Sequence, residues 1–137
     1  MQDRPTCDEL LAAIEMFLDK EIVPNVPGSR GFHARVAANA LRIVRRELEH
    51  REEQFLAEWQ GLDALLGPAA RPATIAALAD GLQERNRQLA ERIRSGDADE
   101  GEFSAQVRAH VLSTVADKLR VSDPGLLERS ASDPSPR

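Results

Sequence analysis

Apolar side chains recur at every third or fourth position along four stretches of the chain, and prolines and glycines separate these stretches. This spacing places side chains on one face of an α-helix. Because proline interrupts a helix interior at a cost of about 3 kcal/mol, the proline-free stretches are where helices can form. The pattern predicts four amphipathic helices, over residues 7–22 (beginning at Pro5 or Cys7), 29–66 (beginning at Ser29 or Arg30), 72–95 and 100–121.

Residues at the ends of these stretches support the predicted boundaries. Thr6 and Glu9 have the spacing of a capping box, in which two side chains bond reciprocally to backbone N–H groups at a helix start. The other terminal signals are an acidic pair at Asp99 and Glu102, a first-turn proline at Pro72 and a C-terminal glycine at Gly96.

The second predicted helix is much longer than the first. As one rod ending at Leu66 it would span about 55 Å at 1.5 Å per residue, more than twice the first helix. Either the rod breaks, between His50 and Gln54 or at Gly61, or its end overhangs the other helices. An overhang would expose large apolar side chains that favour a partner chain. The interface candidates are Phe55, Trp59, Leu62 and Leu66.

These elements predict an all-α fold. We expect a four-helix bundle-like single domain over residues 1–122 and a flexible tail over residues 123–137. The tail is rich in proline and serine, and we expect disorder beyond about Leu127.

Composition supports this fold class and limits the core. Ala, Leu, Arg and Glu make up close to half of the 137 residues, and all four favour helices. The aromatic residues are four Phe and one Trp, with no Tyr, which argues against a β-sandwich or barrel. So few aromatic residues make a thin core, and dimerisation is one way to complete it. We expect a homodimer or a complex with a partner enzyme.

Charge and cysteine content exclude several classes of protein. The formal net charge of −5 excludes a broadly basic surface, so we expect no nucleic-acid partner. Cys7 is the only cysteine, which excludes an intramolecular disulfide and a cysteine-rich zinc site. No stretch has the roughly 18 uncharged apolar residues of a membrane span. The first residues lack a signal-peptide pattern, and we expect a cytoplasmic protein without a membrane partner.

Glu47 and His50 form the one motif that is typical of metal chemistry. A Glu and a His three residues apart project from one helix face, and di-iron bundles use two such pairs with two further glutamates. Neither His33 nor His110 has a Glu three residues before it, so half of that ligand set is missing. We interpret the pair as a surface feature and assign no metal, no cofactor and no catalytic residue.

Polar residues beside the apolar stripes are candidates for binding. Asn39 borders the stripe of the second helix and Asn86 lies within that of the third, where a polar residue often sets register or oligomeric state. Together with Arg46 and Glu47 they would alternatively form a buried polar network around a ligand. His33, next to an apolar stripe, is either a structural residue or a binding residue at a bundle end.

His110, Thr114 and Asp117 share one face of the fourth helix, and Lys118 lies next to it. The set resembles an acid–base site only loosely, because no activated nucleophile accompanies it. We interpret it as the polar flank of an amphipathic helix.

Arginines cluster on the second and third helices, interspersed with glutamates. A salt-bridged, solvated face is the ordinary explanation for this pattern, and a phosphate site is the alternative. The basic positions are Arg42, Arg45, Arg46, Arg85, Arg87, Arg92 and Arg94.

Three segments carry a resemblance to a known family. They are RPTCDELLAAIEMFL at residues 4–18, FHARVAANALRIVRREL at residues 32–48 and DKLRVSDP at residues 117–124. They resemble a family of short uncharacterised bacterial helical proteins encoded beside, or fused to, aminoglycoside-phosphotransferase-like kinases, often near acyl-CoA dehydrogenases. The resemblance implies an accessory role alongside a kinase-like enzyme or in acyl-CoA metabolism. It supplies no catalytic or binding residues.

We therefore expect a non-catalytic helical interaction module. The first alternative is a bundle that binds acyl-CoA or another anionic metabolite, with arginines holding its phosphates. The second is a metalloenzyme built around Glu47 and His50.

Overall fold

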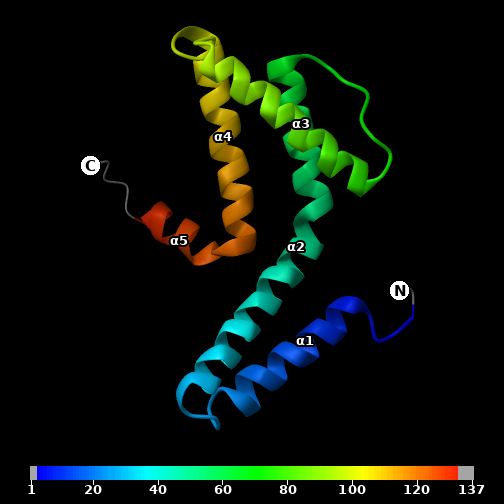
Figure 1. The fold of residues 1–137 in the computed structure, drawn as a ribbon, viewed down its shortest axis with the longest axis vertical. Helices are drawn as coiled ribbons and strands as arrows, with labels where there is room; N and C mark the ends of the chain where they lie inside the picture. Colours follow the sequence, from blue (N-terminus) through cyan, green and yellow to red (C-terminus); the bar gives the residue numbers. More distant parts are fainter. Residues whose placement is uncertain (1–2, 133–137) are drawn as a thin grey trace. The chain divides into compact units, whose positions relative to one another are not determined.

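The computed structural model describes residues 3–132, and these residues form helices and turns without a strand (Figure 1). The predicted all-α fold is confirmed. The chain divides into two compact units, an N-terminal unit of residues 1–49 and a C-terminal unit of residues 50–137. The helical elements are α1 (Cys7–Phe17), the π-helical turn η1 (Leu18–Ile22), α2 (Gly28–Leu66), α3 (Ile75–Arg94), α4 (Gly101–Ser122) and α5 (Pro124–Ser132).

Helix α2 belongs to both units and is continuous, so neither predicted break, between His50 and Gln54 or at Gly61, interrupts it. None of the described helices is both long enough and apolar enough to cross a lipid bilayer.

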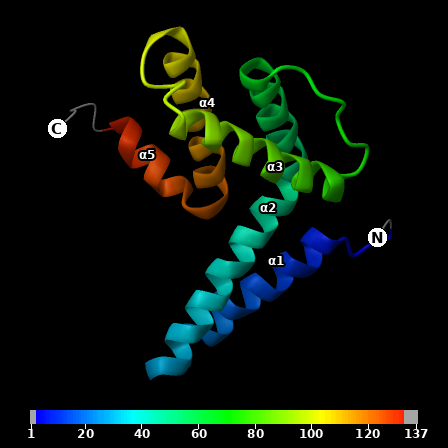
Figure 2. The same cartoon turned by 45° about the horizontal axis from the view of Figure 1, so that its top comes forward.

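The N-terminal unit is a hairpin of α1 and the first half of α2, which lie side by side in both views (Figure 2). The predicted capping box is confirmed: the backbone N–H of Thr6 donates to Glu9 Oε2 at 2.7 Å, and the backbone N–H of Glu9 donates to Thr6 Oγ1 at 3.2 Å. At the other end of the hairpin, Gly31 is buried where any Cβ would overlap the backbone of Val26. The absence of a side chain there allows the tight return of the chain.

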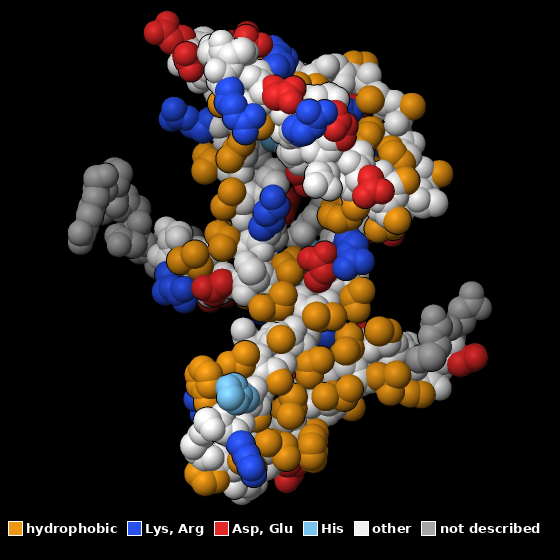
Figure 3. All heavy atoms as spheres, viewed as in Figure 1, with side chains coloured by type: hydrophobic (Ala, Val, Ile, Leu, Met, Phe, Trp, Pro, Cys, Tyr) orange, Lys and Arg blue, Asp and Glu red, His pale blue; other side chains and the backbone are white. Residues whose placement is uncertain are grey.

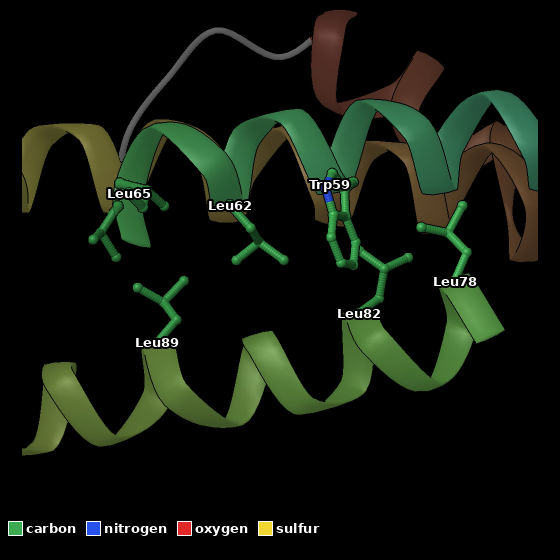
Figure 4. Close-up of a cluster of buried hydrophobic side chains, with 7 residues drawn as sticks. Trp59, Leu62, Leu65, Leu78, Leu82 and Leu89 are labelled. Carbon is green, nitrogen blue, oxygen red and sulfur yellow. The ribbon is translucent and has the colours of Figure 1, made fainter. Parts of the chain in front are cut away.

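The C-terminal unit has a conventional apolar core. Trp59, Leu62 and Leu65 point from α2 toward leucines of α3 (Figure 4). The buried residues of this core are Trp59, Leu62, Leu65, Leu78, Leu82, Leu89 and Val107.

This core corrects the interface assignment made from the sequence. Trp59 and Leu62 are buried within their own unit, and Phe55 and Leu66 pack against them partly buried. The four residues therefore do not form an exposed overhang. Helix α3 runs along the end of α2 and covers them, which the length of α2 alone does not reveal.

Arg85 connects α3 to the end of α2. Its side chain is only 8% exposed, and it donates to Asp63 Oδ1 at 2.5 Å, to the carbonyl of Leu62 at 2.9 Å and to that of Gly67 at 2.8 Å. Its guanidinium also lies 4.8 Å from the ring centroid of Trp59. The two carbonyls lie near and just beyond the C-terminal end of α2, so Arg85 joins α3 to that end. The solvated face inferred for Arg85 from the sequence is therefore wrong.

Three predicted helix ends need correction, and one is confirmed. Helix α3 begins after Thr74, whose hydroxyl accepts from the N–H of Ala77 at 3.2 Å, so Pro72 precedes the helix. Gly96 follows the C-cap Ser95 with φ of +92°, as predicted for a position that favours glycine.

The other two corrections concern α4 and α5. The N-cap of α4 is Glu100, without a side-chain bond, so the expected capping box of Asp99 and Glu102 does not form. Helix α5 continues past Leu127, because Asp123 Oδ1 accepts from the N–H of Leu126 at 3.2 Å and Arg129 pairs with Asp123. The expected disorder beyond Leu127 is thus wrong up to residue 132, and residues 133–137 lie outside the described part of the chain.

Replacing the guanidinium of Arg85 tests its role. We expect Arg85→Met to lower the free energy of unfolding by about 3 kcal/mol, because it removes the partly buried ion pair with Asp63 and two hydrogen bonds to backbone carbonyls. The matched control is Arg87→Met on the same helix, where exposed pairs with Glu84 and Glu91 are lost at a cost of at most about 1 kcal/mol. Urea unfolding followed by circular dichroism measures both. Equal losses in the two variants would contradict the structural role of Arg85.

Candidate functional site

Ion pairs connect the two helices of the N-terminal hairpin along one side. Arg45 donates from Nε to Asp8 Oδ1 at 2.7 Å and from Nη1 to Glu15 Oε2 at 2.8 Å. Arg42 donates from Nε to Glu15 Oε1 at 2.8 Å and also pairs with Asp19. Because these charges lie at fixed positions on antiparallel helices, they set the register of the hairpin.

The pKa values of these carboxyl groups respond to the arginines. The hydrogen bond from Arg45 lowers the pKa of Asp8. Burial by itself would raise the pKa of Glu15, but hydrogen bonds from Arg45 and Arg42 outweigh it and lower that pKa. Both carboxyl groups are therefore ionised at neutral pH, and their pairing with the arginines stabilises the hairpin.

Exposed apolar side chains are the second feature of the hairpin. Leu10, Ile14 and Phe17 are spaced at one face of α1, and Val44 and Leu48 at one face of α2. All five side chains are 44–54% exposed, and apolar side chains gather over α1 and this part of α2 in Figure 3. We call these five residues the hairpin face.

Among the described residues of the N-terminal unit no large apolar side chain is fully buried, and Leu11, Leu18 and Leu41 are partly buried. The buried apolar residues of the N-terminal unit are Ala34 and Ala38 on α2. Small residues allow two helices to approach closely, but their burial removes little apolar surface from water. The hairpin face is thus the larger apolar feature of this unit, and it has the character of a surface that is covered in use.

The structure places the predicted binding residues in different environments. His33 is exposed on α2, with its ring 5.8 Å from that of Phe32, and Asn39 is exposed as well. Arg46 and Glu47 are partly buried in the N-terminal unit, and each interacts with another group of the chain. A buried network that includes Asn39 therefore does not form.

Asn86 is the predicted residue that lies in a pocket. Its Nδ2 donates to Glu58 Oε1 at 2.6 Å, and both residues line a cavity in the C-terminal unit together with His110, Thr114 and Lys118. The sequence places His110 and Thr114 on one helix face with Lys118 next to it, whereas Asp117, the third member of that predicted face, lines another cavity. Glu58 was missed, because one glutamate in a Glu-rich helix carries no distinguishing pattern.

Gly61 makes room for the imidazole of His110. A Cβ at position 61 would overlap the ring, with His110 Cε1 only 2.8 Å away. Burial lowers the pKa of His110, and the nearby charge of Glu58 offsets this only in part, so the imidazole is neutral at pH 7.

His50 lines a second cavity of about 450 Å³ in the C-terminal unit, with Glu53, Asp117 and Arg120 among its neighbours. Arg120 pairs with Asp117, and Gln54 Nε2 donates to the carbonyl of Asp117 at 2.9 Å. Among the described residues, no three acidic, histidine or cysteine side chains are grouped so that they would hold a metal ion.

Comparison with protein families gives one match. Residues 24–126 match a family described as a domain of unknown function, DUF6285. The chain belongs to the DUF6285 family. No curated protein and no solved structure shows significant similarity to it. The DUF6285 match includes the second half of the hairpin and almost all of the C-terminal unit, and it assigns no activity to either.

The lowered pKa of Glu15 predicts how acid affects this DUF6285 chain. A carboxyl whose pKa is lowered by folding stabilises the fold above its ordinary pKa and ceases to do so as the pH falls. We expect Glu15→Gln to cost about 1–2 kcal/mol at pH 7, and the difference from the native chain to shrink as the pH falls from about 5 toward 3. The control is Glu21→Gln, an exposed position in η1. Urea unfolding at each pH is the measurement, and a difference independent of pH would refute the assignment.

Proposed function

We propose that the chain is a non-catalytic helical interaction module whose hairpin face pairs with the hairpin face of a second copy. The observation that supports it is the imbalance within the N-terminal unit. Its buried apolar residues are two alanines, whereas five large apolar side chains on one face remain about half exposed. Burying the remaining half of each would contribute about 1 kcal/mol per side chain.

A second copy fits this face for geometric reasons. Two helices that pair with two more produce a four-helix bundle, the usual way in which helical hairpins bury their apolar sides. A two-fold arrangement uses the same patch on both chains, so each residue of the hairpin face contributes twice.

Charge also favours self-association. The N-terminal unit has nearly equal numbers of acidic and basic side chains, although the whole chain is acidic. Several of these charges are paired with one another within the unit. Two copies would therefore approach through a surface that carries little net charge and meets little electrostatic repulsion.

The family resemblance implies an accessory role beside a kinase-like enzyme or in acyl-CoA metabolism. We include that role in the proposal as the cellular context of the dimer. The same applies to a cytoplasmic location. Acyl-CoA binding has less support from the geometry, because arginines that would hold its phosphates are engaged with carboxylates. These are Arg42, Arg45, Arg87 and Arg92.

Charged substitutions on the hairpin face test the dimer. We expect the native chain to sediment with twice its mass of 15.1 kDa, and the double variant Ile14→Glu with Val44→Glu to sediment as a monomer with unchanged helix content. Both positions are exposed within a single chain, so the fold itself should tolerate the charges.

The matched control for this experiment is Leu112→Glu, which adds a charge at an exposed leucine of α4 and should leave the dimer intact. Sedimentation equilibrium over a range of concentrations gives the result. A native chain that stays monomeric throughout, or a control that dissociates as readily as the double variant, would rule out the proposal.

A further inference from the structure

The pocket that contains Asn86 lies between α2, α3 and α4 of the C-terminal unit and has a volume of about 150 Å³. Polar groups reach it from all three helices: Glu58 from α2, Asn86 from α3, and His110, Thr114 and Lys118 from α4. Apolar side chains form the rest of its wall, namely Leu89, Val111 and Val115. This combination of a short apolar wall and a few convergent polar groups is typical of a small-molecule site.

Glu58 forms no ion pair within the described part of the chain, although Lys118 lines the same pocket. Its carboxylate is partly buried and accepts a hydrogen bond from the neutral amide of Asn86. His110, whose pKa is lowered, supplies no positive charge at neutral pH. Lys118 lines the pocket, but it is exposed and forms no ion pair with Glu58. A partly desolvated carboxylate without a cationic partner attracts one.

The other groups around the pocket define the kind of cation. Thr114 Oγ1 donates to the carbonyl of His110 at 3.0 Å, so its hydroxyl is already engaged within α4. Leu89 is buried at the pocket wall, and Val111 and Val115 present aliphatic carbons near its mouth. These walls suit a short hydrocarbon body better than a hydrated metal ion. The volume limits the ligand to a few non-hydrogen atoms.

We propose that this pocket binds a small aliphatic ammonium compound, with Glu58 as the anionic partner of its ammonium group and Leu89, Val111 and Val115 around its hydrocarbon part. Lys118, which lines the same pocket, would donate to a carboxylate on the same molecule. The ligand is therefore either a simple alkylamine or a small zwitterion of the amino-acid type, and both share the ammonium contact with Glu58. This site is separate from the hairpin face and does not depend on the proposed dimer.

His110 provides a direct reporter of binding. Its imidazole occupies the space above Gly61 and lies within the electrostatic reach of Glu58. The charged and titratable groups around it in the pocket are Glu58 from α2 and Lys118 from α4, since α3 contributes only Asn86 and Leu89. An ammonium bound at Glu58 adds positive charge near the imidazole, which disfavours its protonation. Binding should therefore shift the imidazole resonances of His110 and lower its pKa further.

Titration by nuclear magnetic resonance tests the proposal, with the probes isobutylamine, valine and isobutyric acid. We expect isobutylamine to shift the His110 resonances with millimolar affinity, as suits so small a ligand. Isobutyric acid, which has the same carbon skeleton without the ammonium, should leave them unchanged. Valine that binds more tightly than isobutylamine would identify the zwitterion, and valine that binds more weakly would identify the simple amine; both results support the ammonium contact.

Variants assign the contact to Glu58. Glu58→Gln keeps the acceptor oxygen for Asn86 and removes the charge, and we expect affinity for isobutylamine to fall at least about tenfold. The matched control, Glu52→Gln, removes an exposed charge from the same helix and should bind as the native chain does. Val115→Phe, at an exposed position of the pocket wall, should block binding without unfolding the chain, and it replaces Glu58→Gln if that variant does not fold. The proposal is overturned if isobutyric acid binds as well as isobutylamine, if neither perturbs His110, or if Glu58→Gln folds and binds normally.

Discussion

Two helices packed against each other share a single line of contact, and every large apolar side chain away from that line faces outward. In the N-terminal unit the contact line is occupied by small residues and by the ion pairs of Arg42 and Arg45. The large apolar side chains described in this unit are therefore at most partly buried. The consequence is an apolar face that only a further surface can cover. This constraint underlies the proposed dimer, the role of the ion pairs and the division of the chain into two units.

The C-terminal unit shows how the same kind of helix behaves when a third element is present. Helix α3 runs along α2, so apolar side chains from both helices face a shared interior (Figure 4). Arg85 lies in the same row as Leu78, Leu82 and Leu89 and satisfies carbonyls at the end of α2. Here the core is completed within the chain, and the remaining polar groups of α2, α3 and α4 are free to form a pocket around Glu58.

Local features of the fold could be predicted from the sequence, because neighbouring residues determine them. The capping box of Thr6 and Glu9 and the left-handed Gly96 need only a few residues to form. The burial of Trp59 and Leu62 could not be predicted, since it depends on where α3 lies. Arg85 was misassigned for the same reason. The carbonyls of Leu62 and Gly67 to which it donates become apparent only in the folded chain.

The hairpin face and the pocket around Glu58 show the same limit of prediction from sequence. The hairpin face consists of residues whose spacing predicts a helix core, and only the absence of a third helix in that unit leaves them exposed. The pocket joins His110 and Thr114, which the sequence places on one helix face, to Glu58 and Asn86 from other helices. Sequence spacing identifies one wall of such a pocket, and the opposite wall depends on tertiary structure.

The pairing of two hairpin faces can be measured through the chain's own cysteine. Cys7 is exposed at the start of α1, and a nitroxide attached there introduces no other change. Pulsed electron–electron double resonance should give a distance of less than about 40 Å between the nitroxide labels of two chains. Labels on two hairpins that pair face to face are separated by no more than about the length of the paired helices, and a helix of 20 residues spans about 30 Å. Dilution with unlabelled protein should remove this dipolar signal, and the double variant Ile14→Glu with Val44→Glu should lack it. A labelled native chain that shows no dipolar signal at high concentration would contradict the central claim that the hairpin face is covered by a second copy.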